Sequence, residues 1–281
     1  HGHGVSSHGV RPRWLFFGWD TGYGILRLGE MGSNWGMGLL ANSGDRHDSL
    51  FGDHRFGDIV ERIVFFTKPF YNVFTCIFRE LAVFAGGDLV FSDGTAELLD
   101  GDLAFQAVFG LLLRVDPHRA LGLYVAYRNQ TYDDGDELEV TAIDFYGQWQ
   151  LELAHQVHGY VEGEIVGVLG STTAAPNFDY TRVDVRQLGF AARVGLRLDR
   201  VGLDFRVEGG FASGDADTGD DRIGRFTFDN DYRVGLILFQ EVLAWSSARA
   251  AVLAGHEDLV GVTQDGVELL PTNGSVAGAS Y

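Results

Sequence analysis

The chain of 281 residues contains long segments in which apolar side chains recur at every second position. Residues 103–115, 188–198 and 201–208 each show this alternation, with glycine, small or charged residues between the apolar ones. A period of two places alternate side chains on opposite faces of a β-strand. The spacing therefore predicts an all-β chain whose strands carry one apolar face and one face of glycine and charge.

The predicted strands are long enough to cross a membrane. Residues 104–115 and 188–198 reach the ~9–11 residues that a tilted strand needs to span a bilayer, about twice the usual length of a strand in a soluble protein. No run approaches the ~20 consecutive apolar residues that a membrane helix requires, which excludes a helical membrane protein. A transmembrane β-barrel agrees with both observations, because its lipid-facing residues occupy only every second position.

The links between the predicted strands alternate in length. Short turns are expected near residues 31–33, 69–72, 116–119, 154–155, 199–200 and 246–248. Longer polar links lie at residues 42–58, 92–101, 129–137, 171–181, 213–231 and 256–271. An antiparallel up-and-down barrel with short turns at one end and long loops at the other produces this order, whereas a soluble Greek-key sandwich does not require it. We therefore predict an antiparallel up-and-down transmembrane β-barrel, with about twelve strands visible.

One β-barrel domain is expected over residues 1–281, with residues 1–11 as a frayed end or a truncated strand. Residues 272–281 are expected to open a further strand. The chain begins without a methionine or a signal peptide, and small residues precede Tyr281 where a terminal barrel strand would alternate bulky ones. We interpret it as a processed or truncated piece. In residues 59–91 both faces are apolar, which leaves open a bulge, a partly plugging segment or a pair of strands.

The net charge and a few individual residues argue against some classes of function. The net charge of -18 argues against a nucleic-acid partner, because phosphates require a basic surface. Cys76, the single cysteine, lies among apolar neighbours and is predicted to be a buried, inert thiol. The sequence contains no nucleophile elbow, metal motif or phosphate loop, and His155 and His158 lack a third ligand. We expect neither an enzyme nor a cofactor.

Several short stretches carry a resemblance to known membrane proteins. They are residues 26–29, 34–42, 57–62, 211–215, 226–228 and 234–239. Together these stretches resemble a family of outer-membrane β-barrels that is known mainly from myxobacteria and has no assigned function. Their Arg-x-Gly, Trp-Gly-x-Gly and Ala-Ser-Gly-Asp elements are also similar to those of alginate-export-type porins, which are much longer. The resemblance implies an outer-membrane location in a Gram-negative bacterium, with membrane lipid and lipopolysaccharide as partners.

Charged residues on the alternate face of the predicted strands are the candidate pore lining. They are Arg114, Arg128, Asp144, Glu152, Glu162, Glu164, Arg193, Arg197, Asp204, Arg206 and Glu208. One interpretation is a pore of mixed charge that selects solutes, with Arg193, Arg197 and Arg206 as its basic part. The other is a lumen whose opposite charges pair across neighbouring strands and serve the structure.

Two further groups of residues have candidate roles. The acidic loop with Asp215, Asp217, Asp220 and Asp221 could hold calcium, but it departs from the EF-hand pattern, and a solvated loop is the preferred interpretation. Aromatic residues could form the interfacial girdles of a barrel or the core of a sandwich. They are Trp14, Trp19, Trp35, Trp149, Trp245, Tyr127 and Tyr160.

The sequence thus predicts a porin-like outer-membrane channel for passive diffusion of small or anionic solutes. The alternative is a structural or adhesive outer-membrane barrel with a closed lumen, whose acidic loops bind a partner at the surface. A soluble, carbohydrate-binding sandwich is a third class. Solute identity and oligomeric state do not follow from the sequence.

Overall fold

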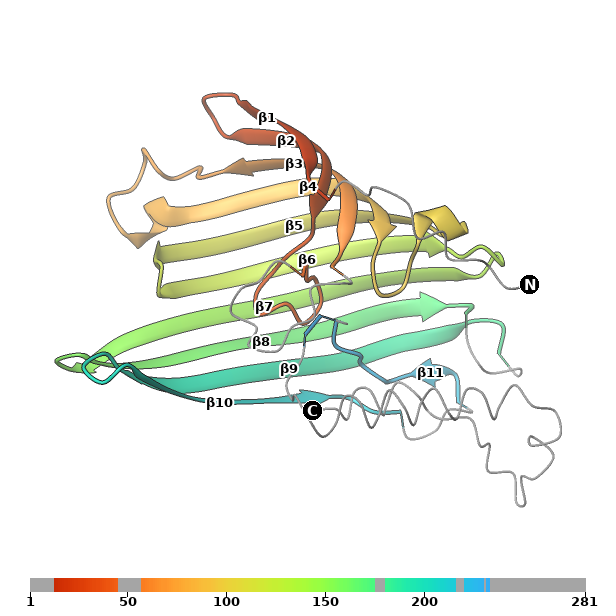
Figure 1. Ribbon diagram of the computed structural model, residues 1–281. Coiled ribbons are helices and arrows are strands. Elements are labelled where there is room, and N and C mark those ends of the chain that lie inside the picture. The colour runs from red at the N-terminus through yellow and green to blue at the C-terminus, as the bar shows by residue number, and fades with distance from the viewer. Residues whose placement is uncertain (1–12, 45–56, 175–179, 216–219, 230, 233–281) are drawn as a thin grey trace, which may run out of the picture.

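One antiparallel sheet contains nearly all the regular structure of the described residues. The computed structural model describes residues 13–44, 57–174, 180–215, 220–229 and 231–232. Figure 1 shows the strands side by side in chain order, as a wall that curves around the segment after β2. The strands are β1 (Leu15–Asp20), β2 (Ile25–Gly32), β3 (Ile59–Thr67), β4 (Leu81–Ser92), β5 (Leu103–Asp116), β6 (Arg119–Thr131), β7 (Glu137–Ala154), β8 (Val157–Thr172), β9 (Val183–Leu198), β10 (Leu203–Ala212) and β11 (Arg222–Ile223). Two short 3-10 helices, η1 (Ile77–Glu80) and η2 (Leu98–Asp100), lie in the links.

The strand order confirms the predicted up-and-down topology. Each strand from β1 to β10 is hydrogen-bonded antiparallel to the next, and β11 pairs in parallel with β9 beyond the end of β10. Among the described residues, the outer edges of β1 and β10 have no strand partner, so the sheet described here is open. About twelve strands were predicted, and those placed beyond residue 232 lie outside the described part of the chain.

The alternation of side chains gives the sheet two chemically different faces. The strands predicted at residues 104–115 and 188–198 are confirmed as β5 and β9. Their apolar residues point away from the interior of the curved wall, onto what we call the outer face, and their glycine and charged residues point inward. Large apolar side chains from β2 to β10 remain exposed on the outer face. They include Leu28, Ile63, Phe105, Phe109, Leu121, Phe145, Ile165, Leu188, Val194 and Phe205.

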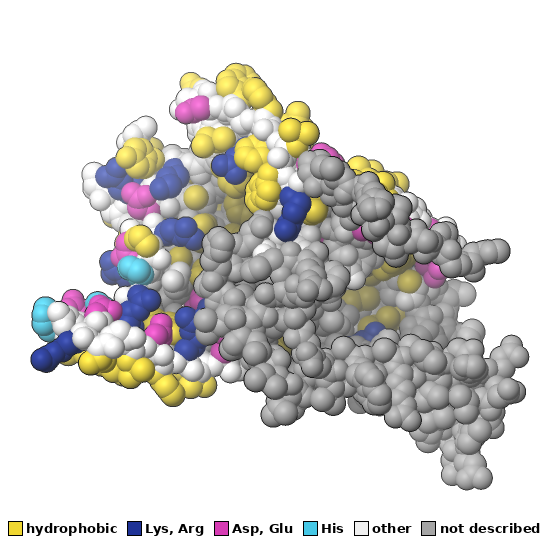
Figure 2. All heavy atoms as spheres, viewed as in Figure 1, with side chains coloured by type: hydrophobic (Ala, Val, Ile, Leu, Met, Phe, Trp, Pro, Cys, Tyr) yellow, Lys and Arg dark blue, Asp and Glu magenta, His cyan; other side chains and the backbone are white. Residues whose placement is uncertain are grey.

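The links fall at two ends of the sheet, which we call the turn end and the loop end. Residues 117–118, 155–156 and 199–202 form short turns at one end, as predicted. Residues 93–102 and 132–136 form links at the other end. Figure 2 shows charged side chains gathered at the turn end, at the left of the view, with hydrophobic side chains along the lower edge. The predicted turn at 246–248, link at 256–271 and strand at 272–281 lie outside the described residues.

One predicted turn was wrong, and a second one belongs to a longer link than predicted. No turn occurs at residues 31–33, because β2 continues to Gly32 and the chain then runs across the interior of the wall. The turn at 69–72 is part of a longer link, residues 68–80, which contains η1. Residues 59–91, where the prediction left three possibilities open, are the strand pair β3 and β4. No helix among the described residues is long and apolar enough to cross a membrane.

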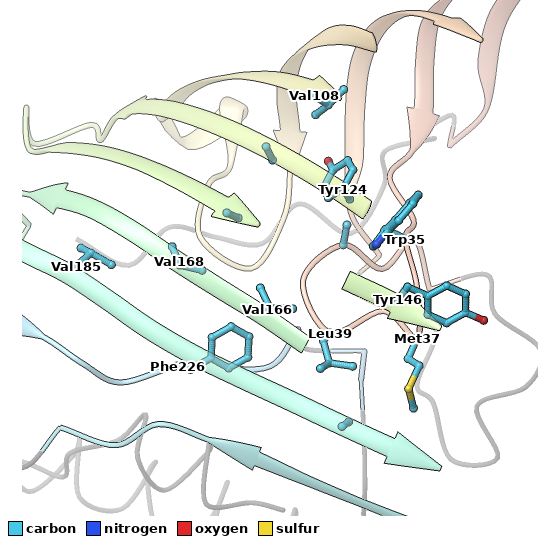
Figure 3. Packing of buried hydrophobic residues seen from close by; sticks show 14 of the residues in the cluster. Trp35, Met37, Leu39, Val108, Tyr124, Tyr146, Val166, Val168, Val185 and Phe226 are labelled. Atoms are coloured by element: carbon cyan, nitrogen blue, oxygen red, sulfur yellow. The ribbon is translucent and has the colours of Figure 1, made fainter. Parts of the chain in front are cut away.

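Residues 33–44, which we call the inner segment, pack against the inner face of the sheet. Trp35, Met37, Leu39 and Ala41 are buried there against strands β5 to β9 and against Phe226 (Figure 3). Of the two roles left open for Trp35, a place in an interfacial girdle is therefore excluded, since its side chain lies in the interior. The chain does contain a segment that partly fills the interior. It lies before residues 59–91, for which the sequence left a plugging segment as one possibility.

Candidate functional site

The inner segment is held by the carboxylate of Glu164, on β8. The backbone N–H groups of Gly38 and Leu39 donate to Glu164 at 3.2 and 3.1 Å, and the N–H of Met37 donates to the same carboxylate. Gly36 and Gly38 have φ values of 51° and 91°, the left-handed conformations that turn successive N–H groups toward one anion. A side chain at Gly36 would also collide with the Glu164 carboxylate. Glycine is thus required where the segment wraps around this acid.

Trp35 fixes the segment at a second point. Its indole N–H donates to Oδ1 of Asp144 on β7 at 3.1 Å, and its ring stacks on Tyr124 of β6 with centroids 5.4 Å apart. A Cβ at Gly122 would lie 2.6 Å from the indole, so glycine at this position admits the ring. Asp144 is completely buried beneath the indole. Both predicted pore-lining acids at the centre of the sheet, Asp144 and Glu164, therefore bind the inner segment.

Two recesses lie on either side of the inner segment. The loop-side recess has a volume of about 260 Å³ and is bordered by Leu40 and Ala41 of the segment, together with Asp58, Asp93 and Arg128. The turn-side recess has a volume of about 350 Å³, and its lining is Asn34, Trp35, Gly36, Leu112, Arg114, Tyr146, Gln148 and Glu162. The inner segment thus separates an apolar recess with acidic groups from a polar recess of mixed charge.

Acidic residues from two links, Asp58 and Asp93, border the loop-side recess. Arg128 pairs with Asp93 and Gln130, and Asp93 also accepts from the N–H groups of Thr95 and Ala96. Burial raises the pKa of Asp93, but the Arg128 charge and these hydrogen bonds outweigh it, so that the pKa lies below its ordinary value. The predicted pore residue Arg128 is therefore neutralised by an acid from the neighbouring link.

Asp58 and Asp229 are shifted in the opposite direction. Burial, followed by the nearby charges of Asp229 and Asp93, raises the pKa of Asp58 well above its ordinary range. Burial is also the main cause that raises the pKa of Asp229 to about 8, with a contribution from the charge of Asp231. Asp229 lies next to the inner segment, because its backbone N–H donates to the carbonyl of Leu39 at 2.9 Å. Asp229 therefore favours the protonated form near neutral pH.

A buried ion network lies on the inner face of β8, β9 and β10, toward the turn end. Arg193 donates to Glu162 at 3.1 Å and to Glu208 at 2.7 Å, and only 9 % of its side chain is exposed. The hydroxyls of Tyr146 and Tyr232 donate to Glu162 and Glu208 at 2.8 and 2.7 Å. The structure thus brings together three predicted pore residues, Glu162, Arg193 and Glu208, and their opposite charges pair with one another.

The remaining predicted pore residues lie closer to the turn end. Arg197 and Asp204 are 3.9 Å apart, and Asp204 also accepts from the hydroxyl of Tyr160 at 3.2 Å. Arg206 donates to the same hydroxyl at 2.9 Å. Arg114 is exposed in the turn-side recess, and Glu152 is exposed near the end of β7. Of the three arginines predicted as the basic part of a pore, Arg193 is buried in its network, while Arg197 remains largely exposed.

Sequence reasoning missed several residues of this interior. Arg62 on β3 forms a two-pronged pair with Asp88 on β4, at 2.7 Å for each contact, and also donates to Ser33 at 3.0 Å. This pair joins β3 to β4, within residues 59–91, where the sequence did not resolve the individual strands. Asp58 and Asp93 stand at link positions that the alternation of strands does not cover.

The other candidate sites have separate outcomes. Asp217 lies outside the described residues, while Asp215 and Asp220 accept from the N–H groups of Gly224 and Arg222 at 3.0 and 2.9 Å. The described part of the chain contains no cluster of three or more metal-ligating side chains. Of the aromatic residues, Trp14, Trp19, Trp149 and Tyr127 are exposed, and Trp245 lies outside the described residues.

Comparisons of the chain with protein-family models, with curated proteins and with solved structures find no match. The resemblance to myxobacterial outer-membrane barrels and to alginate-export-type porins therefore stays a prediction that depends on short motifs.

Proposed function

We propose that the sheet is the wall of a transmembrane β-barrel in the outer membrane and that the barrel is a porin-like channel for small or anionic solutes. The opposite chemistry of the two faces of one continuous sheet supports this proposal. Large apolar side chains cover the outer face, while charged and hydrogen-bonding groups lie on the inner face.

The outer face is best explained by contact with lipid. Soluble monomers rarely expose contiguous apolar patches larger than a few hundred Å². Here such residues occupy alternate positions of neighbouring strands; Leu121 of β6 and Phe145 of β7, for example, both face outward. Strands β5 to β9 have 13 to 18 residues, which exceeds the length needed to cross a bilayer.

A membrane location requires that the sheet be closed. Lipid offers no hydrogen-bond partner to a free strand edge, and each unpaired backbone group there costs several kcal/mol. The edges of β1 and β10 must therefore be paired in the membrane. The curvature of the wall around the inner segment, visible in Figure 1, favours such closure.

The inner segment would be the constriction of the channel. It crosses the interior between the two recesses, and Glu164 and Asp144 hold it from two strands. A solute that moves from one recess to the other has to pass this segment. Arg114 and Arg197, which are exposed toward the turn end, are the basic groups that an anionic solute would meet there.

One observation favours the second candidate, a structural or adhesive barrel with a closed lumen. The interior arginines Arg62, Arg128 and Arg193 all form short ion pairs, and the inner segment is anchored rather than loose. In this case the links of the loop end would carry the function, through a partner at the cell surface.

Conductance distinguishes the two candidates. The full chain, refolded into a planar lipid bilayer, is expected to give discrete ion-conducting steps. The variant Glu164→Ala is expected to raise the size of the steps, because the inner segment loses its anchor. If both proteins insert and neither conducts, the channel proposal is wrong and the closed barrel is favoured.

A further inference from the structure

The link between β3 and β4, residues 68–80, exposes an unusual number of large apolar side chains. Tyr71, Val73, Phe74, Ile77 and Phe78 are each between 43 and 67 % exposed. Cys76 is exposed among them, so the prediction of a buried thiol is wrong. The short turn at residues 155–156, by contrast, consists of an exposed histidine and an exposed glutamine. This link therefore gathers five large, exposed apolar side chains within eight residues of the chain.

The link has a defined conformation, although its apolar side chains face outward. The N–H groups of Tyr71 and Phe74 donate to the carbonyls of Lys68 and Phe70 at 3.1 Å. The rings of Phe70 and Phe74 are 5.2 Å apart, and the guanidinium of Arg79 lies 4.5 Å from the centre of the Tyr71 ring. A folded link that leaves its apolar residues exposed is suited to binding a surface outside the described chain.

The link continues the outer face of the sheet. It follows β3 directly, where Ile63 and Phe65 point outward and are exposed. Lys68 and Arg79 stand at the two ends of the link, and Glu80 is the single acid that pairs with both. Aromatic rings together with an excess of one positive charge suit the boundary between lipid tails and anionic headgroups.

We infer that residues 69–78 insert into the headgroup region of the leaflet at the turn end and anchor this edge of the sheet. The inference rests on the proposed membrane location of the wall. Tyr71, Phe74 and Phe78 lie at the level of the headgroups, and Lys68 and Arg79 face the phosphates. A soluble partner protein is a different occupant of the same surface, and the experiment below separates the two.

The single cysteine makes the inference testable in the full chain. Cys76 is labelled with an environment-sensitive nitrobenzoxadiazole dye, and the protein is refolded into vesicles of phosphatidylethanolamine and phosphatidylglycerol. Lipids that carry a spin label at the headgroup or deep in the acyl chain quench the dye according to its depth. Two matched controls in a Cys76→Ser background place the dye on the wall, with Phe145→Cys, and at the exposed loop end, with Asp134→Cys.

We expect the dye at Cys76 to emit at a shorter wavelength than at Asp134→Cys and to be quenched most by the headgroup label. The dye at Phe145→Cys should be quenched most by the deep label. One outcome is that the wall dye is quenched while the Cys76 dye behaves like the dye at Asp134→Cys. The link is then in water, so its proposed insertion is wrong, while the membrane location of the wall is supported. If the wall dye is also in water, both proposals are overturned.

A second variant guards against an effect of the dye itself. Replacing Phe74 and Phe78 by serine should move the Cys76 emission at least halfway toward that of the loop-end control, because the apolar contacts with lipid are lost. The quenching of a dye at Phe145→Cys should not change in the same variant. Unchanged emission at Cys76 would contradict the assignment of these rings to the interface.

Discussion

The indole N–H of Trp35 donates to Oδ1 of Asp144, 109 residues further along the chain, at a distance of 3.1 Å. This bond joins the segment after β2 to the centre of the wall at β7. Together with the three N–H groups bound to Glu164, it keeps residues 33–44 across the interior. The proposed permeability of the protein therefore depends on two acids that the strand alternation already places on the inner face.

The variant Glu164→Ala tests whether the Glu164 carboxylate holds the inner segment in place. It leaves three N–H groups of the inner segment without their acceptor, which is expected to lower the free energy of unfolding by about 3 kcal/mol. Channel conductance should rise at the same time. The matched control is Glu152→Ala, at an exposed position near the end of β7, which should change neither quantity. Stability is measured by urea unfolding in lipid vesicles. If the variant is as stable as the parent, Glu164 does not hold the inner segment.

Arg193 tests whether the interior charges stabilise the wall. Replacing Arg193 by leucine leaves Glu162 and Glu208 buried without their cation, which should cost about 3–5 kcal/mol. Arg197→Leu, on the same strand but largely exposed, should change stability by less than about 1 kcal/mol. The free energy of unfolding of both variants is measured by the same urea experiment. Equal effects of the two substitutions would show that the network contributes little.

A charge on the outer face tests the contact with lipid. Phe145→Arg is expected to destabilise the protein in vesicles by about 2–4 kcal/mol, because the guanidinium would lie in the hydrocarbon layer. Phe145→Leu serves as the control and should cost less, since it keeps the position apolar. If Phe145→Arg were tolerated as well as Phe145→Leu, the outer face at β7 would be in water.

The pH dependence of stability follows from Asp229. Its folded pKa of about 8 exceeds the ordinary value of 3.8, so the folded protein binds a proton that the unfolded chain releases. The contribution of this group is complete below about pH 4 and is lost as the pH rises through 8. Asp58 shifts in the same direction. The free energy of unfolding should therefore fall between pH 5 and 8, and less steeply in Asp229→Asn than in the parent. The same slope in both proteins would contradict the shift.

The sequence predicts the wall of the structure well. Strands such as β5 and β9 alternate over more than ten residues, and this length fixes both the strand and the face that each side chain occupies. The inner segment was missed for a physical reason: Trp35, Met37 and Leu39 also alternate, so the pattern imitates a strand. The glycines at 36 and 38 and the distant Glu164 decide its conformation, and no local pattern contains that contact.

The candidate site was predicted only in part. Alternation placed Asp144, Glu164 and Arg193 on the inner face, but it does not reveal which charges meet. Pairing depends on the register between strands and on the links that fold inward. Arg128, for example, is neutralised by Asp93, which belongs to a link rather than to a strand. The acids of the links could have been suspected only from their proximity to strand ends.

Heat-modifiability in the native membrane shows whether the sheet is the wall of a transmembrane barrel. The full protein is expressed in a Gram-negative host, the membranes are separated, and unboiled and boiled samples are compared on a denaturing gel. We predict that the protein lies in the outer-membrane fraction and that its unboiled band migrates differently from the boiled one. A protein recovered in the soluble fraction without detergent, with identical bands, would contradict the transmembrane wall.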